Sequence, residues 1–143
     1  MAKRVDPCRK SPEERLDDLL EGHREALLRN EGGRYAARVL EASNSLPNAV
    51  KFFAHAFVAA EADDEEAALA ALEEAEGYLA AAREELPRRL ARELPALAFL
   101  ERGIALRSGR GEFDEALRLC DLALSLGLGP AYERKRASLS RMV

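Results

Sequence analysis

The stretch from Gly111 to Gly127 places the strongest limits on how this chain can fold. Between its two glycines, Ala116, Cys120 and Ala123 recur at spacings of four and then three residues. On an α-helix these residues lie on one face. Because two of them are alanine, a neighbouring helix can approach that face closely. The stretch therefore predicts a tight turn followed by a helix packed against a second helix.

The composition favours helices throughout the chain. Alanine and leucine are the most frequent residue types, glutamate and arginine follow, and all four form helices well. No run of alternating β-branched residues indicates a strand. At 143 residues the chain has the length of one domain. We therefore expect an all-α protein with a single folded domain at residues 11–143.

Capping residues, glycines and prolines divide this domain into helices. Ser11, Pro12 and Glu14 form a complete start signal: the serine caps, the proline suits the first turn, and the glutamate closes a capping box. The first helix is expected to end at Gly32-Gly33. The later helices are expected at about 35–45, from Pro47, from a cap at Asp63 or Asp64 to about Glu85, at 87–93, 95–107 and 112–126, and from near Pro130.

Two of the expected helical hairpins share a pattern of large and small residues. The pattern comprises Phe99, Gly103, Leu106, Gly111, Glu112, Phe113, Ala116, Cys120 and Ala123 in one hairpin, and Phe52, Ala56, Ala59, Ala68, Leu72 and Ala75 in the other. It resembles the tetratricopeptide repeat, a helix-turn-helix unit of about 34 residues that stacks into superhelical arrays. The match is closest over 96–127, weaker over 48–76 and weakest over 11–46.

The resemblance implies about seven helices: three antiparallel hairpins stacked as a right-handed superhelix, and a C-terminal capping helix. Two departures leave open a different helical bundle that contains the motif by coincidence. The turn near Arg110 has one extra residue, and the helix that ends near Glu85 is too long for a regular repeat.

Charge is unevenly distributed along the chain. The net charge is −4, but residues 1–10 and 130–143 each carry +3, so the body between them carries −10. An acidic body argues against wrapping nucleic acid, because that binding depends on neutralising phosphates. Residues 1–10 also contain Pro7 and lack apolar periodicity, so we expect them to form a disordered basic tail.

The residues that usually carry chemistry are scarce. His23 and His55 are the only histidines, Cys8 and Cys120 the only cysteines, and their spacing matches no zinc site. The sequence has no phosphate-binding loop, nucleophile elbow or metalloprotease motif. We therefore expect no enzyme activity, no metal, no cofactor and no disulfide.

The chain also lacks the segments that direct a protein to or across a membrane. No apolar stretch is long enough for a membrane span, and the N-terminus has no signal-peptide core. A cytoplasmic location is expected. The absence of glutamine and the excess of arginine over lysine suit either a heat-adapted protein or a GC-rich genome.

In tetratricopeptide arrays the first helix of each hairpin lines a concave groove. The resemblance therefore implies a partner-binding set of Val50, Phe53, Phe57, Leu97, Leu100, Ile104 and Arg107. Most are apolar, so the groove would hold an apolar segment of a partner protein, unless other helices cover these residues and make them core. The expected function is a non-enzymatic adaptor or scaffold for a protein partner. A self-associating module, such as a homodimer, and an accessory factor that contacts nucleic acid through the basic ends remain alternatives.

Overall fold

All regular structure in the described part of the chain is helical. The computed structural model describes residues 10–43 and 45–143. Its elements are α1 (Pro12–Leu27), α2 (Gly32–Ala42), α3 (Asn48–Glu61), α4 (Glu65–Glu85), α5 (Pro87–Glu93), the 3₁₀ helix η2 (Leu94–Ala96), α6 (Phe99–Gly109), α7 (Phe113–Ser125) and α8 (Pro130–Ser140). The predicted all-α class is confirmed for these residues. Residues 1–9 of the predicted basic tail lie outside the described residues, so their expected disorder stays a prediction.

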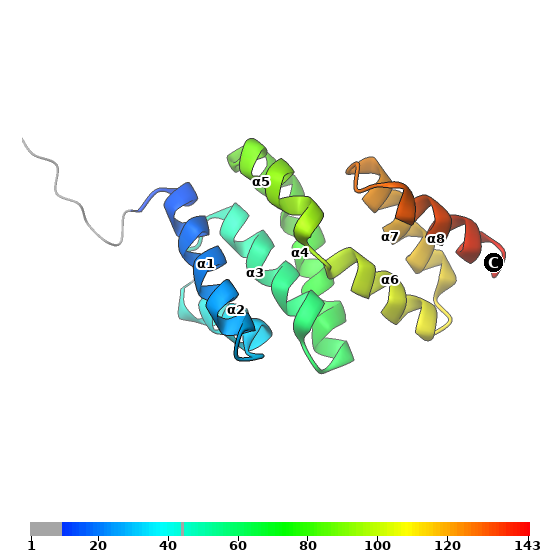
Figure 1. Ribbon diagram of the computed structural model, residues 1–143, viewed down its shortest axis with the longest axis horizontal. Helices are drawn as coiled ribbons and strands as arrows, with labels where there is room; N and C mark the ends of the chain where they lie inside the picture. The colour runs from blue at the N-terminus through cyan, green and yellow to red at the C-terminus, as the bar shows by residue number, and fades with distance from the viewer. Residues whose placement is uncertain (1–9, 44) are drawn as a thin grey trace, which may run out of the picture.

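The helices form a row of hairpins that runs along the longest axis of the molecule (Figure 1). α1 packs on α2, α3 on α4, and α6 on α7. The hairpins meet through α3, which contacts α1, α2 and α6, and through α6, which also contacts α4. α8 packs on α7 at the far end, while α5 and η2 lead from α4 to α6. Other helices therefore cover α3 and α6 from several sides.

Side-chain caps begin two of the helices as the sequence predicts. At α1 the Ser11 hydroxyl accepts a hydrogen bond from the Glu14 N–H at 3.1 Å, and the Glu14 carboxylate accepts one from the Ser11 N–H at 3.0 Å. This is the predicted capping box. At α4 the cap is Asp64, whose carboxylate accepts a hydrogen bond from the Ala67 N–H at 2.8 Å.

Two predicted helix boundaries are wrong. Gly32 and Gly33 begin α2 rather than end α1. The turn after α1 instead uses Asn30, which adopts the left-handed conformation with a φ of 57°. α6 begins at Phe99 rather than Pro95, since Pro95 lies in η2 and the backbone becomes extended just after it.

The core is centred on the aromatic side chains of α3. Phe52 and Phe53 are completely buried, and the Phe52 ring meets the Phe99 ring of α6 edge to face, with centroids 5.6 Å apart. Burial of each such ring contributes about 1.5–3 kcal/mol to the free energy of unfolding. On α7, Ala116 and Ala123 are also completely buried, as their spacing predicts. The packing of α3 against α6 thus joins the second and third hairpins.

Candidate functional site

Most of the predicted groove residues belong to the core. Val50, Phe53, Phe57, Leu100 and Ile104 are all buried, so the prediction that they form an open apolar surface is wrong. The physical reason is that α3 and α6 pack against helices on several sides, which leaves neither helix an uncovered apolar stripe. The alternative interpretation, in which neighbouring helices make these side chains core, is correct.

The two remaining predicted residues, Leu97 and Arg107, are half-buried. Arg107 is engaged within the molecule: its guanidinium lies 2.9 Å from the Glu112 carboxylate and 3.6 Å from that of Glu73. These ion pairs join α6 to α4 and to the turn before α7. Only Leu97 therefore keeps an apolar surface that a partner can reach.

A concavity lies between α1, α3 and η2, and we call it the α1–η2 groove. Its volume is about 210 Å³. It is lined by Leu20, His23, Arg24 and Leu27 of α1, Phe53 and Phe57 of α3, Glu93 of α5, Ala96 of η2, and Leu97. Three of the predicted residues (Phe53, Phe57 and Leu97) thus line a concavity after all, with the two phenylalanines in its buried part.

The floor of the α1–η2 groove is an aromatic stack held by a partly buried polar pair. The His23 imidazole stacks on the Phe57 ring, with centroids 3.6 Å apart and planes 5° from parallel. His23 Nε2 lies 2.6 Å from Glu61 Oε2. Because a carboxylate only accepts hydrogen bonds, the imidazole N–H is the donor. His23 is only 6% exposed, so the pair fixes the floor rather than offering a free base.

Glycines at the start of α2 make room for this pair. A Cβ added at Gly32 would collide with a Glu61 carboxylate oxygen and would lie 3.0 Å from His23 Nε2. A Cβ at Gly33 would lie 3.3 Å from Cβ of Glu61. Gly32 therefore allows the close approach of α2 to the end of α3, where a larger residue would disturb the polar pair.

The rim of the groove exposes leucine. Leu27 is 46% exposed and the adjacent Leu28 is 86% exposed. Arg24 and Glu93 add one charge of each sign to the lining. Sequence reasoning missed the α1 residues because the first hairpin matched the repeat pattern least well. Leu20 and Leu27 are seven residues apart, a helical spacing that could have placed them on one face.

α5 is tied to α1 on one side of this groove. Arg89 of α5 lies 2.6 Å from the Asp17 carboxylate and 3.2 Å from that of Glu13, both on α1. Its side chain is largely buried, and these carboxylates raise the pKa of the guanidinium. Because η2 follows α5 directly, this contact helps to set the separation of α1 and η2.

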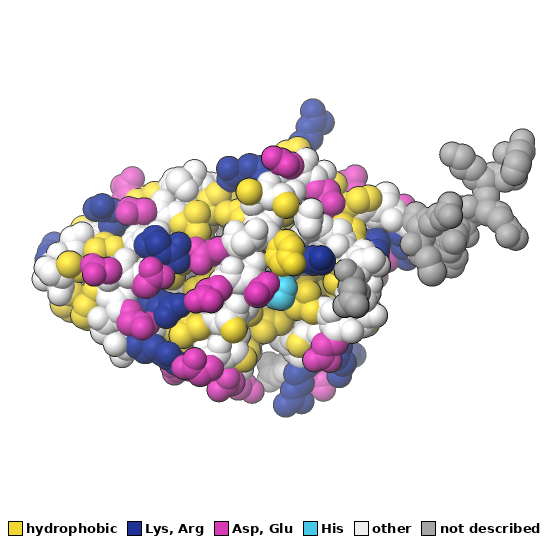
Figure 2. All heavy atoms as spheres, turned by 180° about the vertical axis from the view of Figure 1, so that it is seen from behind, with side chains coloured by type: hydrophobic (Ala, Val, Ile, Leu, Met, Phe, Trp, Pro, Cys, Tyr) yellow, Lys and Arg dark blue, Asp and Glu magenta, His cyan; other side chains and the backbone are white. Residues whose placement is uncertain are grey.

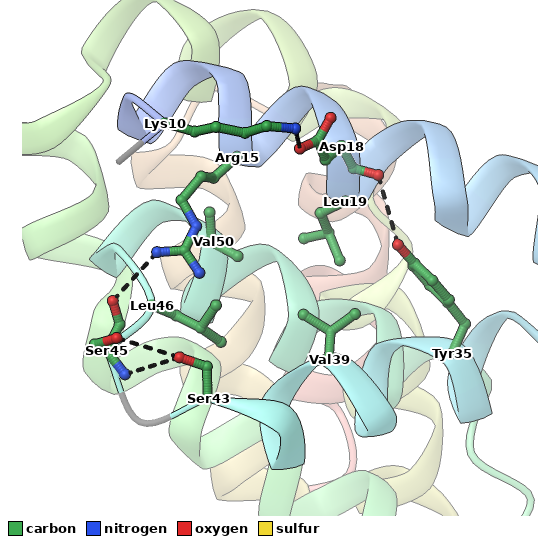
Figure 3. A pocket seen from close by; sticks show the side chains of 10 residues that line it. All are labelled: Lys10, Arg15, Asp18, Leu19, Tyr35, Val39, Ser43, Ser45, Leu46 and Val50. Atoms are coloured by element: carbon green, nitrogen blue, oxygen red, sulfur yellow. Dashed lines mark hydrogen bonds and ion pairs between the residues drawn. The ribbon is translucent and has the colours of Figure 1, made fainter. Parts of the chain in front are cut away.

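A second concavity, which we call the α1–α2 cavity, has a volume of about 510 Å³. Figure 3 shows apolar side chains of α1, α2, α3 and the loop before α3 along its wall, with polar groups around them. Its residues are Lys10, Arg15, Asp18, Leu19, Tyr35, Val39, Ser43, Ser45, Leu46 and Val50. It shares no residue with the α1–η2 groove, and sequence reasoning did not predict it as a site.

A cluster of polar rings lies between α3 and α4. The His55 and Tyr78 rings stack 5.8 Å apart with planes 4° from parallel, and Lys51 Nζ lies 5.3 Å from the Tyr78 centroid. Burial lowers the pKa of His55, nearby Glu74 raises it and Lys51 lowers it further. The adjoining hollow of about 240 Å³ is lined by Leu40, Ser43, Leu46, the two rings and Lys51. This cluster explains His55 as a packed, half-buried side chain.

Acidic and basic side chains are interspersed over the face seen from behind (Figure 2). Ion pairs between helices include Arg118 with Glu76 at 2.7 Å and Arg110 with Glu66 at 2.8 Å. These pairs neutralise two of the arginines. They do not favour the nucleic-acid alternative, which needs a continuous basic surface.

The remaining chemistry-bearing residues do not gather into a site. Cys120 is buried with a free thiol whose pKa burial raises, and Cys8 lies outside the described residues. Within residues 10–43 and 45–143, no three histidine, cysteine, aspartate or glutamate side chains are placed to share a metal ion. Over the same residues, no helix combines the length and apolar character that crossing a membrane requires.

Comparison with known proteins identifies no relative of this chain. No protein-family model, no curated protein and no solved structure matches this chain.

Proposed function

We propose that this chain is a non-enzymatic adaptor that holds an apolar segment of a partner protein in the α1–η2 groove. The observation that carries the proposal is the exposure of Leu27 beside a concave, aromatic-floored site. Exposed large apolar side chains are costly in water, and next to a concavity they are typical of protein interaction sites. Leu28 continues this apolar surface beyond the rim.

The dimensions of the groove indicate what it would hold. A volume of about 210 Å³ accepts an apolar side chain rather than a whole cofactor. The two charges of its lining, Arg24 and Glu93, have opposite signs and so favour a partner with polar residues of both signs around that side chain. An amphipathic helix presents this combination on one face.

The arrangement of hairpins supports placing the chain among tetratricopeptide-like arrays. In that scheme α1, α3 and α6 are the first helices of three hairpins, α2, α4 and α7 are the second helices, and α8 is the cap. α5 and η2 depart from the scheme, since they add a short insertion between the second and third hairpins. The insertion supplies one wall of the α1–η2 groove.

Affinity capture from cells of the source organism with matched variants tests the proposal. Leu27→Asp places a charge at the rim of the groove. Met142→Asp is the control, because Met142 is 62% exposed and lies near the C-terminus. We expect a protein captured by the wild type and by Met142→Asp to be lost with Leu27→Asp, while circular dichroism shows all three equally folded. Capture that is equal for all three would contradict the proposal.

Self-association is the second candidate, and the exposure of Leu27 and Leu28 favours it over the nucleic-acid alternative. Symmetric pairing would bury these side chains against a second copy. Light scattering separates the two candidates: the adaptor proposal expects a monomer, whereas a dimer that Leu27→Asp dissociates would support self-association.

A further inference from the structure

Four arginine side chains among the described residues are half-buried, and they differ in how their charge is satisfied. Arg89 and Arg107 each meet two carboxylates. Arg102 and Arg15 instead donate to main-chain carbonyls, with Arg15 Nη1 3.4 Å from the Ser45 oxygen. Arg15 alone of the four lies in a concavity, the α1–α2 cavity.

The guanidinium of Arg15 retains most of its capacity to donate hydrogen bonds. It has five N–H donors, and its one contact in the described structure is long for a hydrogen bond. No carboxylate of the described residues lies within 4.0 Å of it. In Figure 3 the guanidinium lies near Leu46 and Val50, between α1 and the loop before α3.

The other charges around the cavity cancel. Lys10 Nζ lies 2.7 Å from the Asp18 carboxylate, so these two groups neutralise each other at the edge of the cavity. The Ser43 and Ser45 hydroxyls lie 3.2 Å apart and bond to each other. Among the residues that the structure describes, Arg15 therefore leaves the cavity with a single positive charge that is not offset, which suits a monoanion better than a phosphate dianion.

Four of the lining side chains are aliphatic. Leu19, Val39, Leu46 and Val50 come from three helices and a loop, and they line a space of about 510 Å³. Concave sites of this size, with mostly apolar walls and a few convergent polar groups, are typical of small-molecule sites. Burying an apolar body here would release water chiefly from Val39, because Leu19, Leu46 and Val50 are already largely buried.

We propose that the α1–α2 cavity binds a small carboxylic acid with an apolar body, whose carboxylate pairs with Arg15 and whose body contacts Leu19, Val39, Leu46 and Val50. The planar guanidinium fork matches a carboxylate and can bind both of its oxygens. The site is separate from the α1–η2 groove, so the proposal does not depend on the adaptor function.

Calorimetric titration of the full chain with octanoate tests the site, and octanol serves as the probe that keeps the apolar body and lacks the charge. We expect octanoate to bind, and octanol to bind roughly tenfold more weakly or worse, since the lost interaction is a hydrogen bond to a charged group. Arg15→Gln should weaken the binding of octanoate by a similar factor. Arg38→Gln, at an exposed arginine of α2 outside the cavity, should leave the affinity unchanged.

A second measurement on the wild-type chain keeps the proposal testable if Arg15→Gln does not fold. In amide NMR spectra, octanoate should shift the signals of Arg15, Val39 and Ser45 before those of Leu27 and Leu97. The proposal is overturned by an absence of octanoate binding, by equal binding of octanol, by full affinity in Arg15→Gln, or by shifts confined to the α1–η2 groove.

Discussion

Gly103 shows at the scale of one residue how closely the helices pack. A Cβ at this position would lie 2.7 Å from Leu72 Cδ2 of α4 and 3.3 Å from Leu119 Cδ1 of α7. The residue is buried, and it holds the small position of the repeat-like pattern in α6. Gly77 is its opposite: it lies within α4, is exposed, and has no atom within 4 Å of an added Cβ.

These two glycines give a matched pair of variants. Gly103→Ala should lower the free energy of unfolding by about 1–3 kcal/mol, because the methyl overpacks the contact between α4, α6 and α7. Gly77→Ala should raise it by about 0.5–1 kcal/mol, since alanine loses less backbone entropy in a helix. Urea denaturation of both variants measures the two signs. A stabilising effect of Gly103→Ala would mean that the helices are farther apart than described.

His55 gives the folded state a dependence on pH. Its pKa is lowered below the ordinary value of 6.5, chiefly by burial, so the folded state binds this proton less well than the unfolded chain. Its contribution to stability is present above pH 6.5 and is lost as the pH falls through the lowered pKa. The free energy of unfolding should therefore drop less between pH 7.5 and about pH 5 in His55→Gln than in the wild type. An identical drop in the two proteins would show that His55 is not desolvated.

At the scale of single elements, α5 has little packing to anchor it. It contributes one buried side chain, Leu90, and its other attachment is the ion pairing of Arg89 with Glu13 and Asp17. Since the two carboxylates are themselves exposed, solvent screens much of this attraction. The short helix nevertheless positions η2, and so the width of the α1–η2 groove depends on it.

Arg89→Gln should release α5, with Arg88→Gln as the control because Arg88 is exposed and lies outside the described ion pairs. We expect Arg89→Gln to lower the free energy of unfolding by about 1 kcal/mol. It should also speed hydrogen exchange in residues 87–93 more than elsewhere. Equal exchange in the two variants would show that packing of Leu90 alone holds α5.

At the scale of the whole molecule, the positions of the helices along the chain could be predicted far better than the side chains that neighbouring helices bury. Caps at Ser11 and Asp64 and the short helix at 87–93 follow from local chemistry, which a sequence displays directly. The burial of Leu100 and Ile104 depends instead on which helices flank α6, and spacing within α6 carries no such information. For the same reason the bond from His23 to Glu61, 38 residues apart, could not be predicted.

Site-specific photocrosslinking tests most directly whether a partner protein binds in the α1–η2 groove. A photoreactive phenylalanine analogue would replace Leu27 at the rim of the groove or, in a matched chain, Met142 near the C-terminus. Both positions are exposed, at 46% and 62%. We expect the chain labelled at Leu27 to form a crosslink to one partner protein in cells, and the chain labelled at Met142 to form none. Crosslinking of that partner from Met142 and not from Leu27 would contradict this expectation.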